Sequence, residues 1–327
     1  MRTLTIIVLI AAAAYSGYWL IGSSSVENGA KSAIVNLQDQ GWAVDIADVS
    51  TRGFPSRFDT TLTDINVVSP DGASGWTAPF VQALALSYRP NEVILAFPPT
   101  HQLRLGGVDV ALQTQGLRAS AAVAARPSAP LTKLTAELET GTATFSPDTV
   151  VGLGKSLLAL RETDAPNTYD AYLDLSDVEL PSRIANLLPQ DADLSSRIAQ
   201  ISLDTKLGLD RPLDRHMSDG PQPQIETLDV NGAIIQWGAA SLRAKGALNV
   251  DPSGIPTGNL TLTLRNWDGL LDLAVTLGAI PEGVAPTVRR MAGLMAAGSD
   301  TLELPLTFQN GTTMLGPFPL GPAPRFR

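Results

Sequence analysis

The most regular pattern along the chain is a two-residue alternation of apolar and polar positions. Between residues 201 and 210, Ile201, Leu203, Leu207 and Leu209 are separated by mainly polar residues. A period of two with one apolar face is typical of antiparallel strands that pack on one side only. The alternation recurs at residues 131–140, 169–176, 242–250 and 260–265.

Shorter apolar runs predict further strands at residues 42–49, 58–68, 81–88, 93–97 and 108–114. Turns rich in Gly, Pro, Asp and Asn separate the strands, for example at residues 69–72 and 89–91. Near the end of the chain, Asn310 and Gly311 between apolar runs predict a tight hairpin. These patterns predict a mainly β (α+β) fold with long curved antiparallel sheets and a few helices.

A long uncharged segment follows Arg2. Residues 4–21 contain no charge, and at about 1.5 Å per residue they span about 27 Å, close to the hydrocarbon thickness of a bilayer. Tyr18 and Trp19 stand near the far end, where interfacial aromatic residues are enriched. The sequence therefore predicts a transmembrane signal anchor in the inner membrane, a single pass, and a periplasmic body. A cleaved signal peptide ending at residues 12–14 and a buried helix are the alternatives.

Three more helical segments are predicted. Residues 24–27 fit a capping box for a separate amphipathic helix over residues 25–40, which ends at Gly41. Proline at position 147 predicts a helix that runs to about Arg161, and a helical pair follows near the end. The helix over residues 25–40 has an apolar face made of Ala30, Ala33, Ile34 and Leu37. We expect this face to pack on a core, and binding to the membrane surface is the alternative, for which Lys31 is the one lysine that could meet lipid phosphates. The helical pair covers residues 268–277 and 286–297.

These elements suggest four segments. Residues 1–22 form the anchor, and residues 23–145 form a juxtamembrane helix and a first β-rich half. Residues 146–167 form a helix and connection, and residues 168–327 form a second β-rich half with the helical pair and the hairpin. The order of sheet, helix and sheet suggests two similar halves.

Composition narrows the possible partners. The net charge is −9 and the basic residues form no long run, which argues against nucleic acid because phosphate binding needs a basic surface. The chain has no cysteine, so disulfides and thiolate metal sites are excluded. Hydrophobic residues make up 44% of the chain, enough for a substantial core.

The search for catalytic chemistry yields only weak candidates. His101 and His216 stand apart from each other and from any metal-ligand spacing, and both are expected in loops or at the surface. The segment at residues 152–156 resembles the end of a phosphate loop, but Thr149 stands where that loop needs glycine. We therefore expect Gly152 and Gly154 to permit close helix packing. The acidic residues at 210–219, and Asp191 with Asp193, are expected in solvated loops rather than in cation sites, and Arg289 with Arg290 at the surface. The sequence predicts neither an enzyme nor a cofactor nor a metal.

The segment at residues 51–59, TRGFPSRFD, is the strongest candidate for a binding site. Pro55 and Gly53 predict a rigid corner, with Phe54 and Phe58 pointing inward. Arg52 and Arg57 have nearby partners in Asp48 and Asp59. A second interpretation assigns Arg52 and Arg57 to anionic lipid headgroups, because the corner follows the anchor closely.

Three stretches carry a family resemblance: QGWAVDIADVSTRGFPSRFDTTLTDINV, WTAPFVQALALSYRPNEVILAFP, and the end of the chain, LRNWDGLLDLAV with LELPLTFQNGTTMLGPFPLGPAPRF. Together with the N-terminal anchor they resemble the bacterial family of domain of unknown function 2125, over nearly the whole chain. The layout is more distantly similar to AsmA-like proteins. That likeness implies inner-membrane anchoring, curved periplasmic sheets, and a role in envelope maintenance and lipid movement. The family resemblance supplies no reaction and no catalytic residues.

Two functional hypotheses follow. In the first, the apolar strand faces form a groove that shelters phospholipid acyl chains, and the partners are the bilayer and phospholipid. In the second, the same faces close into a dry core, and the chain is a structural or interaction protein of the envelope. Alternation alone cannot separate them, because a dry core and a lipid-filled groove need the same residue types.

Overall fold

The structure is a computed structural model, which describes residues 1–146, 149–188, 194–218, 222–278 and 280–326. The described chain is mainly β, with nineteen strands in antiparallel pairs and a few helices, which confirms the predicted fold class. It divides into two compact units. The first contains residues 1–125 and 136–146, and the second contains residues 126–135 and 147–327. The similarity of the two halves stays a prediction.

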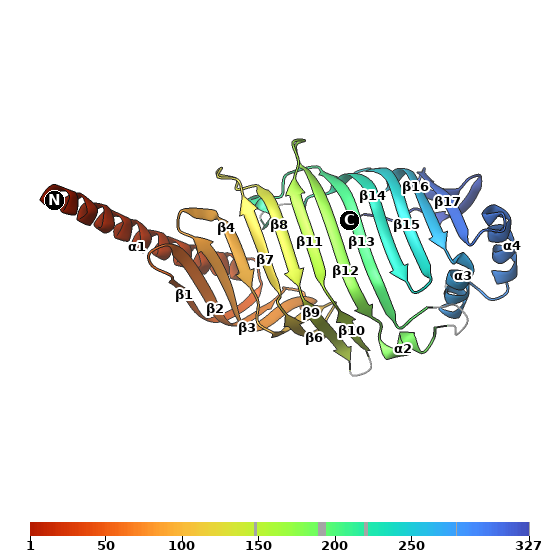
Figure 1. Ribbon diagram of the computed structural model, residues 1–327, viewed down its shortest axis with the longest axis horizontal. Helices are drawn as coiled ribbons and strands as arrows, with labels where there is room; N and C mark the ends of the chain where they lie inside the picture. Colours follow the sequence, from red (N-terminus) through yellow and green to blue (C-terminus); the bar gives the residue numbers. More distant parts are fainter. Residues whose placement is uncertain (147–148, 189–193, 219–221, 279, 327) are drawn as a thin grey trace. The chain divides into compact units, whose positions relative to one another are not determined.

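The first unit combines one long helix with a branched sheet (Figure 1). Strand β3 is the branch point, since it pairs with β2, with β4 along one part and with β5 along another. From there β4 pairs with β7, and β5 continues through β6 to β9. The elements are α1 (Arg2–Asp39), β1 (Ala43–Arg52), β2 (Arg57–Val68), β3 (Ser74–Leu86), β4 (Arg89–Ala96), β5 (Thr100–Leu105), β6 (Val108–Gln115), β7 (Arg118–Val123) and β9 (Thr140–Ser146).

The second unit is a meander in which consecutive strands from β11 to β19 pair side by side (Figure 1). Strand β8 (Leu131–Leu138) contributes residues to both units. The other strands are β10 (Thr149–Leu153), β11 (Ser156–Glu162), β12 (Thr168–Glu179), β13 (Arg197–Leu209), β14 (Ile225–Trp237), β15 (Ala240–Val250), β16 (Pro256–Arg265), β17 (Thr301–Gln309), β18 (Thr312–Leu315) and β19 (Phe318–Pro322). The helices are α2 (Ser182–Ala185), the 3₁₀ helix η2 (Arg215–Ser218), α3 (Trp267–Thr276) and α4 (Ala285–Ala296).

The helix predicted up to Arg161 is wrong, because this segment forms β10 and β11. Its proposed start, Pro147 and Asp148, lies outside the described residues. Strand β11 pairs with β12 along its length, and this pairing overrides the weak local helix signal. Gly154 therefore serves close strand contact rather than helix packing, since a Cβ there would lie 2.9 Å from the carbonyl oxygen of Ser176.

The separate helix predicted over residues 25–40 is also wrong, because α1 continues unbroken from Arg2 to Asp39. The Ser25 hydroxyl donates to the Ile21 carbonyl within the helix, 2.8 Å away, instead of capping a new one. Gly41 does end the helix, with a φ of 87°. Of the predicted apolar face, Ala33 is exposed, and Ala30, Ile34 and Leu37 are half-buried.

The predicted turn at residues 89–91 is wrong as well, since β4 begins at Arg89 and the turn lies at Ser87 and Tyr88. The hairpin at Asn310 and Gly311 is confirmed, with φ values of 50° and 72° between β17 and β18.

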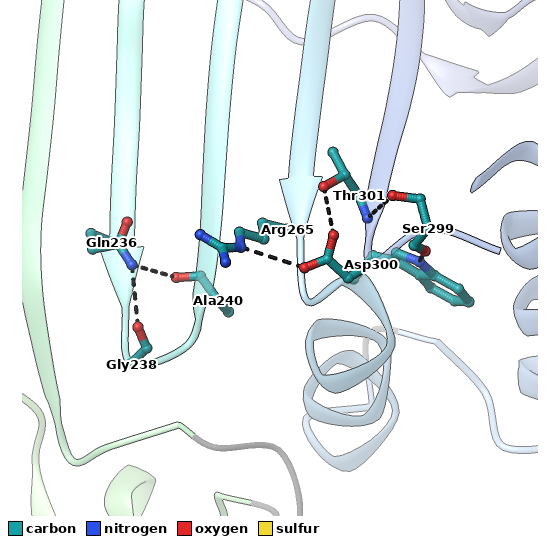
Figure 2. A network of polar contacts seen from close by, with 8 residues as sticks. Gln236, Gly238, Ala240, Arg265, Ser299, Asp300 and Thr301 are labelled. Carbon is teal, nitrogen blue, oxygen red and sulfur yellow. Dashed lines mark hydrogen bonds and ion pairs between the residues drawn. The ribbon is translucent and has the colours of Figure 1, made fainter. Parts of the chain in front are cut away.

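The predicted helical pair is confirmed as α3 and α4, an insertion between β16 and β17. Polar contacts hold its two ends where the strands pair, with Arg265 opposite Thr301 (Figure 2). Arg265 Nε lies 3.5 Å from Asp300 Oδ2, and the Trp267 indole donates to the Ser299 carbonyl over 3.2 Å. The insertion therefore leaves and rejoins the sheet at one register position.

His101 is buried in β5, 7% exposed, which corrects its expected surface position. Its ring packs edge-on to Trp76 at a centroid distance of 6.4 Å and tilted against Phe97 at 6.5 Å. Its Nδ1 lies 3.2 Å from the Pro98 carbonyl, which places the proton on Nδ1 in the neutral ring. Burial lowers the pKa of His101, because desolvation disfavours the charged imidazolium.

We predict that acidification destabilises the first unit through His101. Its folded pKa lies below the unfolded value of 6.5, so the unfolded chain takes up the proton first and stability falls as pH drops below 6.5. In His101→Gln, the unfolding free energy from urea titrations should fall less between about pH 7.5 and pH 5.5 than in the wild type. The exposed His216→Gln is the control for loss of a histidine. Identical slopes in the wild type and His101→Gln would contradict the prediction.

Candidate functional site

Two turns of the first unit meet at one end of its sheet. Residues 53–56 join β1 to β2, and residues 87–88 join β3 to β4. The Ser87 N–H donates to the Ser56 carbonyl over 2.9 Å and ties the turns together. Ser87 is fully buried. We call residues 53–56 and 87–88 the tip.

Three aromatic side chains of α1 bind the tip. The Trp19 indole donates to the Arg57 carbonyl over 2.8 Å, at the start of β2. The Tyr18 hydroxyl donates to the Ser87 carbonyl over 2.6 Å, and the Tyr15 hydroxyl lies 2.9 Å from Ser87 Oγ. Because these residues stand three and four positions apart, they share one helix face. The contact combines ring burial with three hydrogen bonds.

Trp19 is the centre of this contact. It is 9% exposed, and its ring meets Phe54 edge-on at 5.4 Å and lies 6.2 Å from the ring of Phe58. Gly22 follows one turn later, and the absence of a side chain is required there, since a Cβ would lie 2.6 Å from the Phe58 ring. The helix therefore packs directly on the buried end of β2.

The same helix face continues along the sheet to the end of α1. Ser23, Ala30, Ile34 and Leu37 are buried or half-buried at helical spacing. Near the far end, the Gln38 side chain donates to the Val44 carbonyl over 2.9 Å. By contrast, residues 1–14 are exposed throughout, and Figure 1 shows this part of α1 projecting clear of β1 to β4. α1 thus has a free apolar half and a docked half.

The structure confirms the rigid corner and partly corrects its side chains. Phe58 points inward and is 3% exposed, whereas Phe54 is 56% exposed. Arg57 forms the expected ion pair with Asp59, with Nε 3.0 Å from Oδ1. Arg52 lies opposite Asp59 in the β1–β2 register and forms no ion pair with any described residue, Asp48 included. Both arginines stand beside the tip, and their contact with lipid headgroups stays a prediction.

The second unit presents an apolar face built by strand register. One row of directly opposed residues crosses the sheet from β11 to β17, and each member pairs with the next. A flanking row on the same face is almost as apolar, because facing positions recur every second residue. We call these two rows the leucine face. The central row is Leu158, Leu173, Leu203, Ala233, Ala244, Leu262 and Leu304, and the flanking row is Ser156, Leu175, Ile201, Ile235, Leu242, Leu264 and Leu302.

The leucine face is not closed over its centre. Leu158 is 43% exposed, and every other member of the central row is half-buried. Burial is complete toward both ends of the strands: Tyr169, Leu248 and Phe308 are under 7% exposed at one end, and Ala240 and Leu302 are at most 5% exposed at the other. At the first of these ends the Tyr169 hydroxyl accepts a hydrogen bond from the Leu213 N–H over 3.2 Å, so a loop closes that margin. The centre of the face keeps apolar surface in contact with solvent.

The opposite face of this sheet is polar. It carries two open depressions of about 650 and 460 Å³, the first beside Arg243 and Lys245 and the second beside Arg161 and Asp170. Arg161 and Asp170 form an ion pair at 3.1 Å. Mixed charges on an exposed surface favour solvation of this face rather than binding of one ligand.

The remaining sequence candidates form no reactive constellation in the described chain. Arg211 pairs with Asp210 at 2.8 Å, as expected for a solvated loop, and holds the pKa of that carboxyl below its usual range. Arg289 pairs with Asp268 and Asp272 across α3 and α4. No group of three or more His, Asp or Glu side chains among the described residues is placed to hold a metal ion. Asp191, Asp193 and Asp219 lie outside the described residues.

Fold and site together define a class of chain: a β-rich body behind one N-terminal apolar helix. Among the described residues, α1 is the helix long and apolar enough to cross a membrane, a property that signal sequences share. Residues 19–324 match the family described as an uncharacterized protein conserved in bacteria (DUF2125), and the chain belongs to this family. No curated protein matches the chain. No solved structure matches it either, so the likeness to AsmA-like proteins has no support from these comparisons.

We predict that Trp19 carries the docking of α1. Trp19→Ala should lower the unfolding free energy of the first unit by about 3 to 5 kcal/mol, because a large buried ring is removed. Urea titration of the full chain in mild detergent measures this change. Leu20→Ala, one position along and 60% exposed, is the matched control and should change stability by less than about 0.5 kcal/mol. Equal effects of the two substitutions would show that α1 is not held by this contact.

Proposed function

We propose that this chain is an inner-membrane-anchored periplasmic protein that binds phospholipid acyl chains on its leucine face, in the service of cell-envelope maintenance. The observation that carries the proposal is the incomplete burial of the central row of that face, in which Leu158 is exposed and the other six residues are half-buried. In a closed core, residues at the centre of a sheet face are the most completely buried. Here the centre is more exposed than the margin at Tyr169 and Phe308.

The physical argument rests on the cost of exposed apolar surface. Soluble proteins rarely expose contiguous apolar patches larger than a few hundred square ångströms unless the patch binds something. The central and flanking rows together span seven strands, and Ser156 is the one polar residue among them. Acyl chains match such a surface, since each methylene removed from water contributes roughly 0.8 kcal/mol. The directional groups that a polar ligand would need are absent from both rows, apart from that serine.

The helices of the second unit support the same proposal. α3 lies against β15 and α4 against β17, and α2 lies against β10. Leu271 and Leu273 of α3 are buried, so this helix covers apolar surface near β15. Since β15 and β17 are two of the seven strands that carry the rows, and β10 is not one of them, the rows keep room for a ligand.

The anchor is proposed from the free half of α1. Leu4, Ile6, Ile7, Val8, Leu9 and Ile10 are each more than half exposed, a costly arrangement in water and a favourable one in lipid. Arg2 lies at the N-terminal end of this stretch, and a positive charge at that end favours retention of the N-terminus on the cytoplasmic side of the membrane. This orientation directs the β-rich body to the periplasm. The proposed role is binding rather than catalysis.

We predict that phospholipid accompanies the full chain through purification in mild detergent, as detected by native mass spectrometry. Leu262→Glu places a charge in the central row and should reduce the bound lipid several-fold. Thr261→Glu is the matched control, because the adjacent residue lies on the polar face opposite Lys245. Repeated absence of lipid from the wild type would contradict the proposal and favour the alternative, a structural or interaction protein with no ligand.

The orientation is tested by a reporter that is active only outside the cytoplasm, fused after residue 327. We expect activity in intact cells, because Arg2 retains the N-terminus inside. The intact mass of the membrane-bound protein should include residues 1–14. An inactive reporter would overturn the orientation, and a mass that lacks residues 1–14 would replace the anchor by a cleaved signal peptide.

A further inference from the structure

We propose that the tip of the first unit is itself a membrane-binding element, immersed at the boundary of headgroups and acyl chains where α1 leaves the bilayer. This inference rests on the proposed anchor. It goes beyond it, because a helix could anchor the chain and still hold the body clear of the membrane. It also places the side chains of Phe54 and Tyr88 in lipid.

The first argument is the length of helix that is free to span. Arg2 bounds the apolar stretch at one end, and Tyr15 is the first residue bound to the tip. Residues 2–14 reach about 20 Å at 1.5 Å per residue, whereas the hydrocarbon core is about 30 Å thick. The shortfall of about 10 Å matches the upper end of the roughly 5–10 Å to which interfacial segments enter the headgroup and acyl boundary. A straight α1 that spans the bilayer therefore carries the tip into that boundary.

The second argument is the direction of the strands. At one end of the docked half, the Trp19 ring packs on Phe54 of the tip. At the other end, Gly41 follows the last turn of α1, and a Cβ there would lie 3.5 Å from the side chain of Pro70. Pro70 belongs to the turn that joins β2 to β3 at the end of the sheet opposite the tip. The docked half of α1 therefore runs along the strands from end to end. When α1 crosses the membrane, these strands stand upright and the tip faces the lipid.

The third argument is the chemistry of the tip surface. Phe54 is 56% exposed and Tyr88 is 64% exposed, and Leu86 beside them is 39% exposed. Aromatic rings with one polar edge concentrate at membrane interfaces, and arginine next to them reaches headgroup phosphates while its stem stays in apolar surroundings. Arg52 and Arg57 stand at this position. An exposed pair of aromatic rings beside an apolar helix thus has a natural environment in lipid.

The test exploits the absence of cysteine from the chain. Single cysteines are placed at Ser56 and Tyr88 in the tip and at Ser74, at the other end of the 13-residue strand β3 from Leu86, a distance of about 40 Å. A fourth is placed at Ala12, in the free half of α1. Ser56 and Ser74 are both exposed, so Ser56→Cys and Ser74→Cys are a matched pair of nearly isosteric changes. Each variant of the full chain carries an environment-sensitive fluorophore in vesicles of phosphatidylcholine and phosphatidylglycerol.

Two quenchers then report the position of each label: iodide in water, and lipids with a nitroxide near the top of the acyl chain. We expect lipid quenching at Ser56→Cys and Tyr88→Cys to exceed that at Ser74→Cys several-fold, with iodide quenching in the reverse order. Tip labels as open to iodide as the label at Ser74→Cys, with Ala12→Cys quenched by lipid, would overturn the inference and leave the anchor standing. A label at Ala12→Cys that escapes the lipid quencher would overturn both.

Discussion

The structure of the second unit depends on strand register. Side chains alternate faces with a period of two, so a slip of one residue between any two strands would exchange the leucine face for the charged one. Leu203 would then leave the central row and Asp204 would enter it. The register shift between Asp204 and Thr205 on β13 shows how the alternation is maintained, because an extra residue in β14 keeps Val230 and Ala233 on the apolar side. The leucine face is therefore continuous across seven strands because each neighbouring pair of strands has the register that places apolar residues on the same side.

In the first unit, a helix covers the apolar face of the sheet. Its apolar residues Phe58 and Ile65 are nearly inaccessible, and the ring of Phe58 meets α1 at Trp19 and Gly22. The element that closes this face is therefore the element that carries the apolar N-terminal stretch. Docking begins at Tyr15, directly after the small residues 12–14. The contacts that hold the helix on the sheet therefore all lie after residues 12–14, and cleavage there would not remove them.

Much of this was predictable from local pattern. Alternation located β8, β12, β13, β15 and β16, and the Asn310 and Gly311 pair located the last hairpin, because these signals are set by residues that are close in sequence. The prediction of a helix before Arg161 was wrong because β11 is defined by its pairing with β12. Local propensity contains no information about this partner strand. The break expected at Ser24 failed for a similar reason: the docked face of α1, from Trp19 to Leu37, keeps one helix continuous across it.

The candidate sites divide along the same line. The corner beside Arg52 and Arg57 was predictable, because Gly53 and Pro55 mark a corner in any context, whereas the exposed position of Phe54 was not. Ser87 and Tyr88 gave no signal, since the position of their turn is set by the hydrogen bond from Ser87 to Ser56, a residue distant in sequence. The incomplete burial of the leucine face could not be predicted from the sequence either, because residues such as Leu173 and Leu262 would show the same alternation if they lay in a filled core. An open face and a filled core differ in whether another element covers the apolar residues. The first unit has a helix of suitable length over its apolar face, and the second places α3 and α4 beside β15 and β17. Because the leucine face is only partly covered, its burial by a partner would release hydrophobic free energy. A flexible apolar chain can fill such a face without hydrogen-bond complementarity.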